Sequence, residues 1–158
     1  MNKVTIIIPL YNSVRYLEET LSSVNAQTYK NIEVIVVDDG SNDGSYALAK
    51  TFEGETIKVV KNEGKGACAA RNYGFELSSG DYIQYLDADD LLSRDKIQLQ
   101  VEALNKTKDA IAVCSTKHFY NSIDNGRITD KAFLYSTEDI EAFLLNLYGA
   151  NGDHNMVG

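Results

Sequence analysis

Three carboxylates occupy four consecutive positions in YLDADDLL: Asp87, Asp89 and Asp90. Like charges this close repel one another, so water must solvate them on a loop or a cation must lie among them. Alternating carboxylates in the pattern D-x-D offer two hard oxygen ligands of the kind that Mg²⁺ and Mn²⁺ prefer, and such an ion would bridge to the phosphate oxygens of a ligand. The pattern therefore predicts a divalent-cation site in which Asp89 and Asp87 take part.

Polar side chains also follow two earlier stretches that read as strands. Pro9, Tyr11 and Asn12 lie at the end of VTIIIP, and Asp38 and Asp39 lie at the end of EVIVVDD. A single such end is most simply a solvated turn, because Asp, Asn, Gly and Ser favour turns. Three aligned strand ends indicate more, because ligands of open parallel sheets bind beyond the carboxyl ends of the strands. The chemistry of this set fits a nucleoside diphosphate held through a metal.

The elements that would position these residues can be read from five apolar runs, at 4–9, 33–39, 56–60, 81–86 and 110–115. Runs that are apolar on both faces are typical of parallel strands buried between helices. Helical stripes separate several of them, two opened by the expected N-caps Ser13 and Ser93. A third stripe, over Ala67, Ala70 and Gly74, consists of small residues, so its helix should lie close to the sheet. We predict an α/β fold with three layers, α/β/α, around a mostly parallel central sheet.

Composition limits the function classes. The 158 residues, 44% of them hydrophobic, suffice for a single domain over 1–158. The 15 Lys and Arg against 23 Asp and Glu argue against nucleic acid as a partner, since that needs a basic face. No stretch is long enough for a membrane span. Cys68 and Cys114 match no zinc or redox spacing, so we expect reduced core cysteines in a cytoplasmic protein. Residues 116–135, with an Asn-Gly pair, predict a hairpin or a mobile loop.

Four blocks together resemble one known family. TIIIPLYN, VIVVDDGSNDGS, NEGKGACAARNYG and DYIQYLDADDLL are similar, in order and spacing, to the family 2 inverting glycosyltransferases with the GT-A fold, over roughly residues 3–105. The resemblance implies a nucleotide-sugar donor, most often a UDP-sugar, and Mg²⁺ or Mn²⁺ as cofactor. It also implies transfer to a saccharide or lipid-linked acceptor with inversion at the anomeric carbon, as in polysaccharide biosynthesis.

The resemblance also implies roles for individual residues at the base of the donor. Pro9 and Tyr11 would flank the base, with Tyr11 stacking on it. Asp39 would accept a hydrogen bond from the uracil N–H, with Asp38 beside it. A carboxylate in that place discriminates between bases, because the wrong base leaves a buried acceptor unpaired.

Further roles concern the phosphates. By the same resemblance Arg71 would face the base and phosphate side, Asp87 would lie near the ribose and the metal, and Asp89 would be the direct metal ligand. An arginine supplies a fixed cation in an acidic neighbourhood. The metal would neutralise the charge that develops on the leaving diphosphate.

Inverting transfer also needs a base that takes the proton of the acceptor hydroxyl. In the family this is an Asp well beyond the D-x-D. The late acids here are Asp124, Asp130, Asp139 and Asp153. We assign the base to none of them, and Asp139 is better explained as an acid at a helix N-terminus. We therefore expect the chain to be the donor-binding portion, ending before the acceptor-binding portion that carries the base. Any attachment to the inner face of a membrane would then come through parts outside this chain.

Two other functions remain open from the residues alone. GKGACA, at 64–69, satisfies G-x-G-x-x-A with Asp87 about twenty residues further on, as in a dinucleotide-binding Rossmann domain. That fingerprint belongs at the first β–α turn, whereas here it lies in the middle of the chain. A phospho-acceptor signalling domain would bind Mg²⁺ through acids at strand ends, with Lys117 as its lysine. Its acidic pair should close the first strand, where this chain has Pro-Leu-Tyr-Asn.

Overall fold

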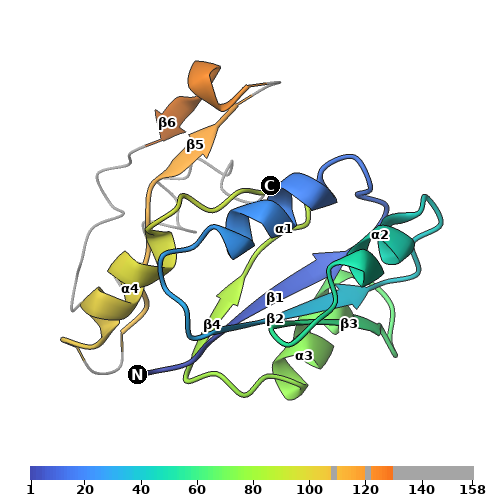
Figure 1. Cartoon of the computed structure of the whole chain (residues 1–158), viewed down its shortest axis with the longest axis horizontal. Coiled ribbons are helices and arrows are strands. Elements are labelled where there is room, and N and C mark those ends of the chain that lie inside the picture. The colour runs from blue at the N-terminus through green and yellow to red at the C-terminus, as the bar shows by residue number, and fades with distance from the viewer. Residues whose placement is uncertain (108–109, 120–121, 130–158) are drawn as a thin grey trace, which may run out of the picture. The chain divides into compact units, whose positions relative to one another are not determined.

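The computed structural model describes residues 1–107, 110–119 and 122–129, and the chain divides into two units, Met1–Asn105 and Lys106–Gly158. The first unit alternates strands and helices (Figure 1). Its strands are β1 (Val4–Leu10), β2 (Ile32–Asp38), β3 (Ile57–Lys61) and β4 (Tyr82–Tyr85). Its helices are α1 (Leu17–Asn25), α2 (Ser45–Thr51), α3 (Ala67–Glu76) and α4 (Lys96–Leu104). Four of the predicted strands are therefore present.

The four strands form one parallel sheet in the order β3-β2-β1-β4. Ile7 in β1 lies opposite Ile35 on one side and Tyr85 on the other. The chain moves outward from β1 to β3, and then returns to add β4 on the free side of β1. The strand order thus reverses between β1 and β4, which is the position where open α/β sheets bind their ligands.

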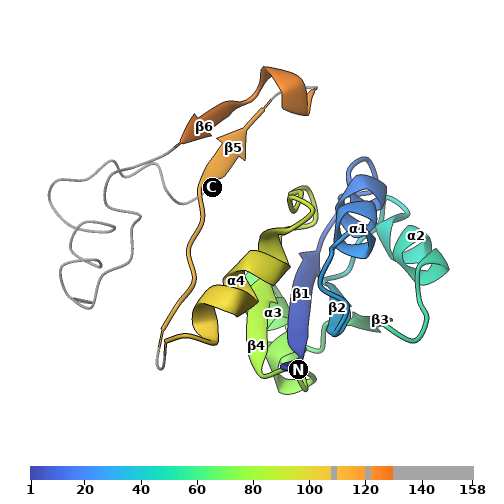
Figure 2. The ribbon, with the colours of Figure 1, turned by 60° about the vertical axis from the view of Figure 1, so that its left-hand side comes forward.

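Helices cover both faces of this sheet. Figure 1 shows α1 and α2 on one face and α3 on the other. Side chains alternate accordingly: Ile6 and Ile8 pack in the cluster with α1, whereas Ile35 and Val37 pack with Ala70 of α3. Helix α4 lies beside β4 (Figure 2) and packs Ile97 and Val101 into the α1 cluster. The predicted three-layer fold with a mostly parallel central sheet is confirmed.

Helix α3 lies very close to the sheet, as its small residues predict. A Cβ atom added at Gly74 would overlap Cγ2 of Ile7 and lie 3.3 Å from Cγ2 of Val37. Only glycine allows this approach without displacing the helix. Because Arg71 lies one turn earlier on the same helix, the close packing at Gly74 also affects how far Arg71 lies from the sheet.

Both expected N-caps are wrong. Helix α1 begins at Leu17, and Ser13 instead donates from its hydroxyl to the carbonyl of Tyr11 at 3.1 Å. Helix α4 begins at Lys96, and the backbone N–H of Lys96 donates to the carbonyl of Ser93 in the turn before the helix. Helix α2 had no counterpart among the predicted helices, because its seven residues are too few to show a clear apolar stripe.

The second unit corrects another prediction. Residues 110–115 form no strand, and Ile111 is 88% exposed, so the fifth predicted strand is wrong. Strand β5 (Thr116–His118) pairs antiparallel with β6 (Arg127–Thr129), with the 3₁₀ helix η1 (Ile123–Asn125) between them. Residues 120–121 and 130–135 of the segment expected to be a hairpin or loop lie outside the described residues.

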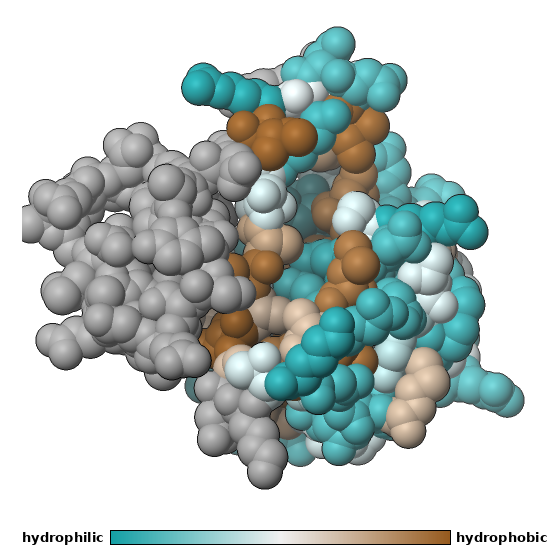
Figure 3. Space-filling view, turned by 90° about the vertical axis from the view of Figure 1, so that its left-hand side faces the viewer, coloured by the Kyte–Doolittle hydropathy of each residue, from teal (hydrophilic) through white to brown (hydrophobic). Residues whose placement is uncertain are grey.

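The expectation of core cysteines is also wrong. Cys68, in the first turn of α3, and Cys114 are both exposed. Hydrophobic side chains remain at the surface too: Leu99 of α4 is 63% exposed, and brown residues are visible among teal ones on the face in Figure 3. Within the described part of the chain, no helix is long and apolar enough to cross a membrane.

Candidate functional site

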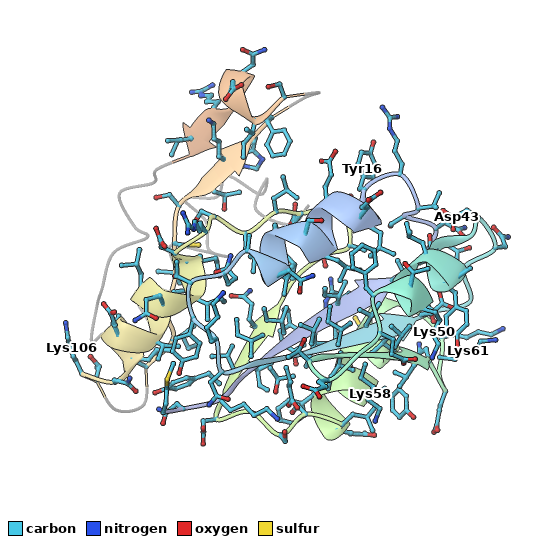
Figure 4. All side chains as sticks on the ribbon, in the orientation of Figure 1. Tyr16, Asp43, Lys50, Lys58, Lys61 and Lys106 are labelled. Atoms are coloured by element: carbon cyan, nitrogen blue, oxygen red, sulfur yellow. The ribbon has the colours of Figure 1, made fainter. Side chains whose placement is uncertain are left out.

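The loops after β1 and β2 are joined by hydrogen bonds. Three successive backbone N–H groups of the first loop donate to side chains of the second loop and of the first residue of α2. Asn12 donates to Ser41 Oγ at 3.1 Å, Val14 to Asp43 Oδ2 at 3.0 Å, and Ser13 to Ser45 Oγ at 2.8 Å. The backbone N–H of Asn42 donates in return to Asn12 Oδ1 at 2.9 Å. These bonds hold the loop that carries Tyr11, and Figure 4 labels Tyr16 and Asp43 on the two loops.

Asp43 is the acid at the centre of this junction. The Ser45 hydroxyl, followed by the backbone N–H groups of Val14 and Ser45, holds the pKa of the Asp43 carboxyl below its usual range. Asn12 has φ 47°, in the left-handed region that asparagine tolerates better than most residues. Tyr11, directly before it, is 59% exposed, so much of its ring is open to a stacking partner.

The two acids at the end of β2 have different partners. Asp38 is 3% exposed, and its oxygens accept from the backbone N–H groups of Gly40 and Ser41, each at 3.3 Å. Asp39 accepts from Asn62 Nδ2 at 2.7 Å and from the backbone N–H of Gly66 at 2.8 Å. Asp38 therefore shapes its own turn, whereas Asp39 links the end of β2 to the loop between β3 and α3.

That link bears on the glycine-rich segment 64–69. Gly66, at φ 89° just before α3, directs its N–H to Asp39 rather than leaving it for a ligand phosphate. The segment also follows β3, the edge strand, whereas the strand order reverses between β1 and β4. A dinucleotide fingerprint belongs at the first β–α turn, so the geometry argues against that alternative.

An ion pair connects α3 to the chain beyond β4. Arg71 Nη2 lies 2.6 Å from Asp87 Oδ1, and the two side chains are 33% and 41% exposed. Exposed ion pairs add little to the stability of a fold, so the value of this one lies in positioning. It holds a guanidinium beside the D-x-D pattern and engages one of the two Asp87 oxygens.

The D-x-D segment forms a tight turn. The backbone N–H of Asp90 donates to the carbonyl of Asp87 at 3.1 Å. Ala88 is buried at 4% exposure and Asp89 is exposed, so the intervening alanine anchors the turn. Among the described residues, the side chain of Asp89 makes no hydrogen bond or ion pair, which leaves its oxygens open to a ligand.

The donor set fits a cation that is shared with a phosphate ligand. No group of three or more His, Cys, Asp or Glu able to hold a metal occurs within residues 1–107, 110–119 and 122–129. Asp89 and the second oxygen of Asp87 remain as candidate protein ligands. Mg²⁺ in phosphate-handling sites is commonly held in this way, by one or two carboxylates together with substrate phosphates and water.

The residues predicted from the sequence are thus only partly in contact. Arg71 and Asp87 touch, and Pro9 lies half-buried near the end of β1. Asn62 and Asp43 were not singled out from the sequence, although Asp-Gly-Ser is a common turn and cap pattern that points to Asp43. Of the late acids, Asp124 is exposed in η1, and Asp130, Asp139 and Asp153 lie outside the described residues.

Comparison with known proteins identifies relatives along most of the chain. The family model described as "Glycosyl transferase family 2" matches residues 5–156. Glycosyltransferase GlyA of Streptococcus pneumoniae serotype 4 is 34% identical over 161 residues, which cover 91% of this chain and 23% of GlyA. An uncharacterized glycosyltransferase of Rickettsia typhi is 44% identical over 113 residues, covering 70% of this chain and 35% of that protein. The chain therefore spans about a third or less of the length of these relatives.

Two solved structures are similar to this chain in fold. S. aureus TarS 1–349 in complex with UDP-GlcNAc superimposes with a TM-score of 0.62 at 27% identity, covering 66% of this chain and 31% of that one. A mannosyltransferase from Pyrobaculum calidifontis in complex with GDP-Man and Mn²⁺ superimposes with a TM-score of 0.58 at 30% identity, covering 64% and 32%. Both neighbours hold a nucleotide sugar.

Proposed function

The chain belongs to glycosyl transferase family 2 and has the GT-A fold of its structural neighbours, and we propose that it forms the donor-binding portion of an enzyme that uses a UDP-sugar and inverts the anomeric carbon. The observation that carries the proposal is the Arg71–Asp87 pair at 2.6 Å, with exposed Asp89 two residues further on. Asp87 and Asp89 follow β4, which pairs with β1 where the strand order reverses, and Arg71 reaches them from α3.

The base of the donor would lie among Pro9, Tyr11 and Asp39. The exposed ring of Tyr11 offers a stacking surface, and the Asp39 carboxylate offers an acceptor. Asp39 already accepts bonds from Asn62 and Gly66, but a carboxylate has about four lone-pair sites and retains capacity for one more donor. Uracil presents an N–H in this way and cytosine does not, so these residues should prefer UDP to CDP.

The diphosphate would lie at Arg71 and the D-x-D turn. A chain of net charge −8 repels an anionic ligand unless local cations intervene. Arg71 supplies one such charge, held in place by Asp87. A Mg²⁺ or Mn²⁺ ion bound by Asp89, with Asp87 beside it, would supply the remainder and neutralise the leaving diphosphate. The mannosyltransferase neighbour, which is described with Mn²⁺, supports the choice of cofactor.

Transfer also requires a general base and an acceptor site. We place both in the part of the relatives' length that this chain does not cover, which is about two thirds or more. The acceptor would be a saccharide or a lipid-linked saccharide, as in polysaccharide biosynthesis. General-base catalysis contributes roughly 10²–10⁴-fold, so the chain alone should bind the donor and transfer sugar poorly.

Calorimetry tests the proposed function directly. UDP should bind in the presence of Mn²⁺ and lose most of its affinity in EDTA, whereas CDP should bind more weakly under both conditions. NAD and a phosphoryl mimic serve as ligands for the two alternative functions. Binding of NAD without metal, in place of UDP, would overturn the proposal in favour of a dinucleotide-binding domain.

A further inference from the structure

Helix α1 and the residues just after it direct three polar side chains toward the segment that follows β4. Thr20 is 0% exposed and Gln27 is 1% exposed, with half-buried Ser23 between them in the sequence. The spacing of three residues places Thr20 and Ser23 on one side of α1, and Gln27 follows two residues after Asn25, where the helix ends. Burying polar groups is unfavourable unless they are hydrogen-bonded, so this stripe requires a structural reason.

The stripe bonds to the segment 88–97 throughout its length. Thr20 Oγ1 donates to the carbonyl of Ala88 at 3.0 Å, and Ser23 Oγ accepts from the N–H of Leu92 at 3.2 Å. The Gln27 amide donates to the carbonyl of Ser93 at 2.9 Å and accepts from the N–H of Ile97 at 3.2 Å. Residues 86–95 contain no helix or strand of their own, so bonds within an element do not hold them. Figure 1 shows this stretch, between β4 and α4, running beside α1.

The first of these bonds reaches the middle of the D-x-D pattern. Ala88 separates Asp87 from Asp89, and its carbonyl belongs to the planar peptide unit that leads to the Cα atom of Asp89. Thr20 Oγ1 also lies 3.3 Å from the carbonyl of Tyr16, but the hydroxyl has one proton and the contact with Ala88 is shorter. Orienting this carbonyl therefore orients the backbone from which the Asp89 side chain projects.

We propose that Thr20 is a positioning residue for the divalent cation, acting through the carbonyl of Ala88 on the carboxylate of Asp89. This inference rests on the proposed function, because it presumes that Asp89 binds the metal. A functional site requires its ligands to be held within about 0.5 Å of the productive geometry. Thr20 supplies that constraint from the buried side of α1, and Ser23 and Gln27 fix the rest of the segment.

The test compares Thr20→Val with Thr20→Ser in the 158-residue chain. Valine has a similar shape without the hydroxyl, and serine keeps the hydroxyl. Partners outside the first ligand shell typically change metal affinity by 10- to 100-fold, so Thr20→Val should weaken Mn²⁺-dependent UDP binding by about 10-fold in calorimetry. Mn²⁺ affinity in the presence of UDP, followed by electron paramagnetic resonance, should fall in parallel. Uridine binding in EDTA, followed by NMR, should not change, and Thr20→Ser should restore most of the metal-dependent affinity.

Thr51→Val is the matched control. Its hydroxyl donates to the carbonyl of Leu48 at 2.7 Å within α2, on an exposed surface, so its loss should leave UDP binding unchanged. If Thr20→Val does not fold, Ser23→Ala removes the acceptor of Leu92 from a less buried position and should show the same selective loss, though smaller.

The outcomes separate this inference from the proposed function. Wild-type chain that binds UDP no better with Mn²⁺ than with EDTA would overturn the proposed function and the inference with it. Metal-dependent binding in the wild type that Thr20→Val leaves unchanged would overturn the inference alone. Equal weakening of UDP–Mn²⁺ and of uridine in EDTA, in Thr20→Val or in Ser23→Ala, would show a general effect on the fold and would also overturn it.

Discussion

Arg71 Nη2 lies 2.6 Å from Asp87 Oδ1, so a side chain on α3 holds the first acid of the D-x-D turn beyond β4. Helix α3 leads the chain from β3 across the sheet to β4, which pairs with β1. The pair is therefore assembled by the same crossover that reverses the strand order. This geometry links the fold to the ligand chemistry that we propose.

Arg71→Lys tests whether the shape of the guanidinium matters beyond its charge. Lysine keeps the positive charge but lacks the planar guanidinium, whose several N–H groups can bind a carboxylate and a phosphate at the same time. A hydrogen bond to a charged group contributes about 1.5–3 kcal/mol, so we expect UDP affinity to fall by about 10-fold or more. The urea midpoint should barely change, because the ion pair is exposed. Calorimetry that shows wild-type affinity in Arg71→Lys would remove this role.

Asp89→Asn should abolish most of the metal dependence of UDP binding. The carboxylate is exposed and has no partner in the described part of the chain, so its charge is available to a cation. We expect the ratio of UDP affinities in Mn²⁺ and in EDTA to fall by about 10-fold or more, as for loss of a metal ligand. Glu55→Gln removes one negative charge from the exposed turn before β3 and should keep the ratio. An unchanged ratio in Asp89→Asn would contradict the metal-ligand assignment.

Asp39→Ala should weaken UDP more than it weakens pyrophosphate. The carboxylate can receive the uracil N–H, and a lost buried hydrogen bond leaves the donor of the ligand unpaired, at a cost of about 1–3 kcal/mol. Calorimetry with both ligands measures the two losses. Asn62→Ala separates the acceptor role from the loop contact, because it removes one partner of Asp39 and keeps the acid. Equal losses for UDP and pyrophosphate in Asp39→Ala would show that the residue acts through charge and not through the base.

Glu33 should make the free energy of unfolding depend on pH in the acidic range. Burial alone would raise the pKa of Glu33, but hydrogen bonds from Lys3, Thr5 and Ser79 outweigh it and lower the pKa to about 2, from 4.5. A lowered pKa in the folded state means that the stabilisation is complete above about pH 4.5 and is lost as pH falls toward 2. Urea unfolding of wild type and Glu33→Gln should differ by about 2–3 kcal/mol at pH 7 and converge near pH 2. A difference that does not change with pH would contradict this assignment.

Gly74→Ala should destabilise the fold by about 1–3 kcal/mol, the usual range for overpacking a core. The added methyl group would overlap Ile7 and push α3 away from the sheet. UDP affinity should also fall, because Arg71 moves with the helix. Gly54→Ala is the matched control, since a Cβ atom there meets nothing within 4 Å. Urea midpoints that shift equally in both variants would show that helix α3 does not depend on the small residue at 74.

Local patterns in the sequence were sufficient to predict the four strands of the sheet and three of the four helices of the first unit. The buried strands could be predicted because β-branched runs such as VTIIIP report burial on both faces, whatever their neighbours are. The close approach of α3 followed from Gly74 and Ala70 in the same way. The acids led to the hypothesis of a cation and a phosphate ligand through their spacing and through their place at three strand ends. Two predictions that depended on contact with another segment were wrong: residues 110–115 form no strand, and Cys68 is not buried.

Only the tertiary structure decided which of these residues meet. The sequence alone predicted a parallel sheet, but the order β3-β2-β1-β4 depends on the side of β1 to which the chain returns. That order brings Arg71 to Asp87, sixteen positions away, and Thr20 to Ala88, sixty-eight positions away. Such hydrogen bonds depend on distance and angle between groups on different elements, and short-range periodicity contains no information about either. The sequence thus determined which groups we propose for the nucleotide-sugar site, and the packing of α1 and α3 against the sheet decided how those groups are held.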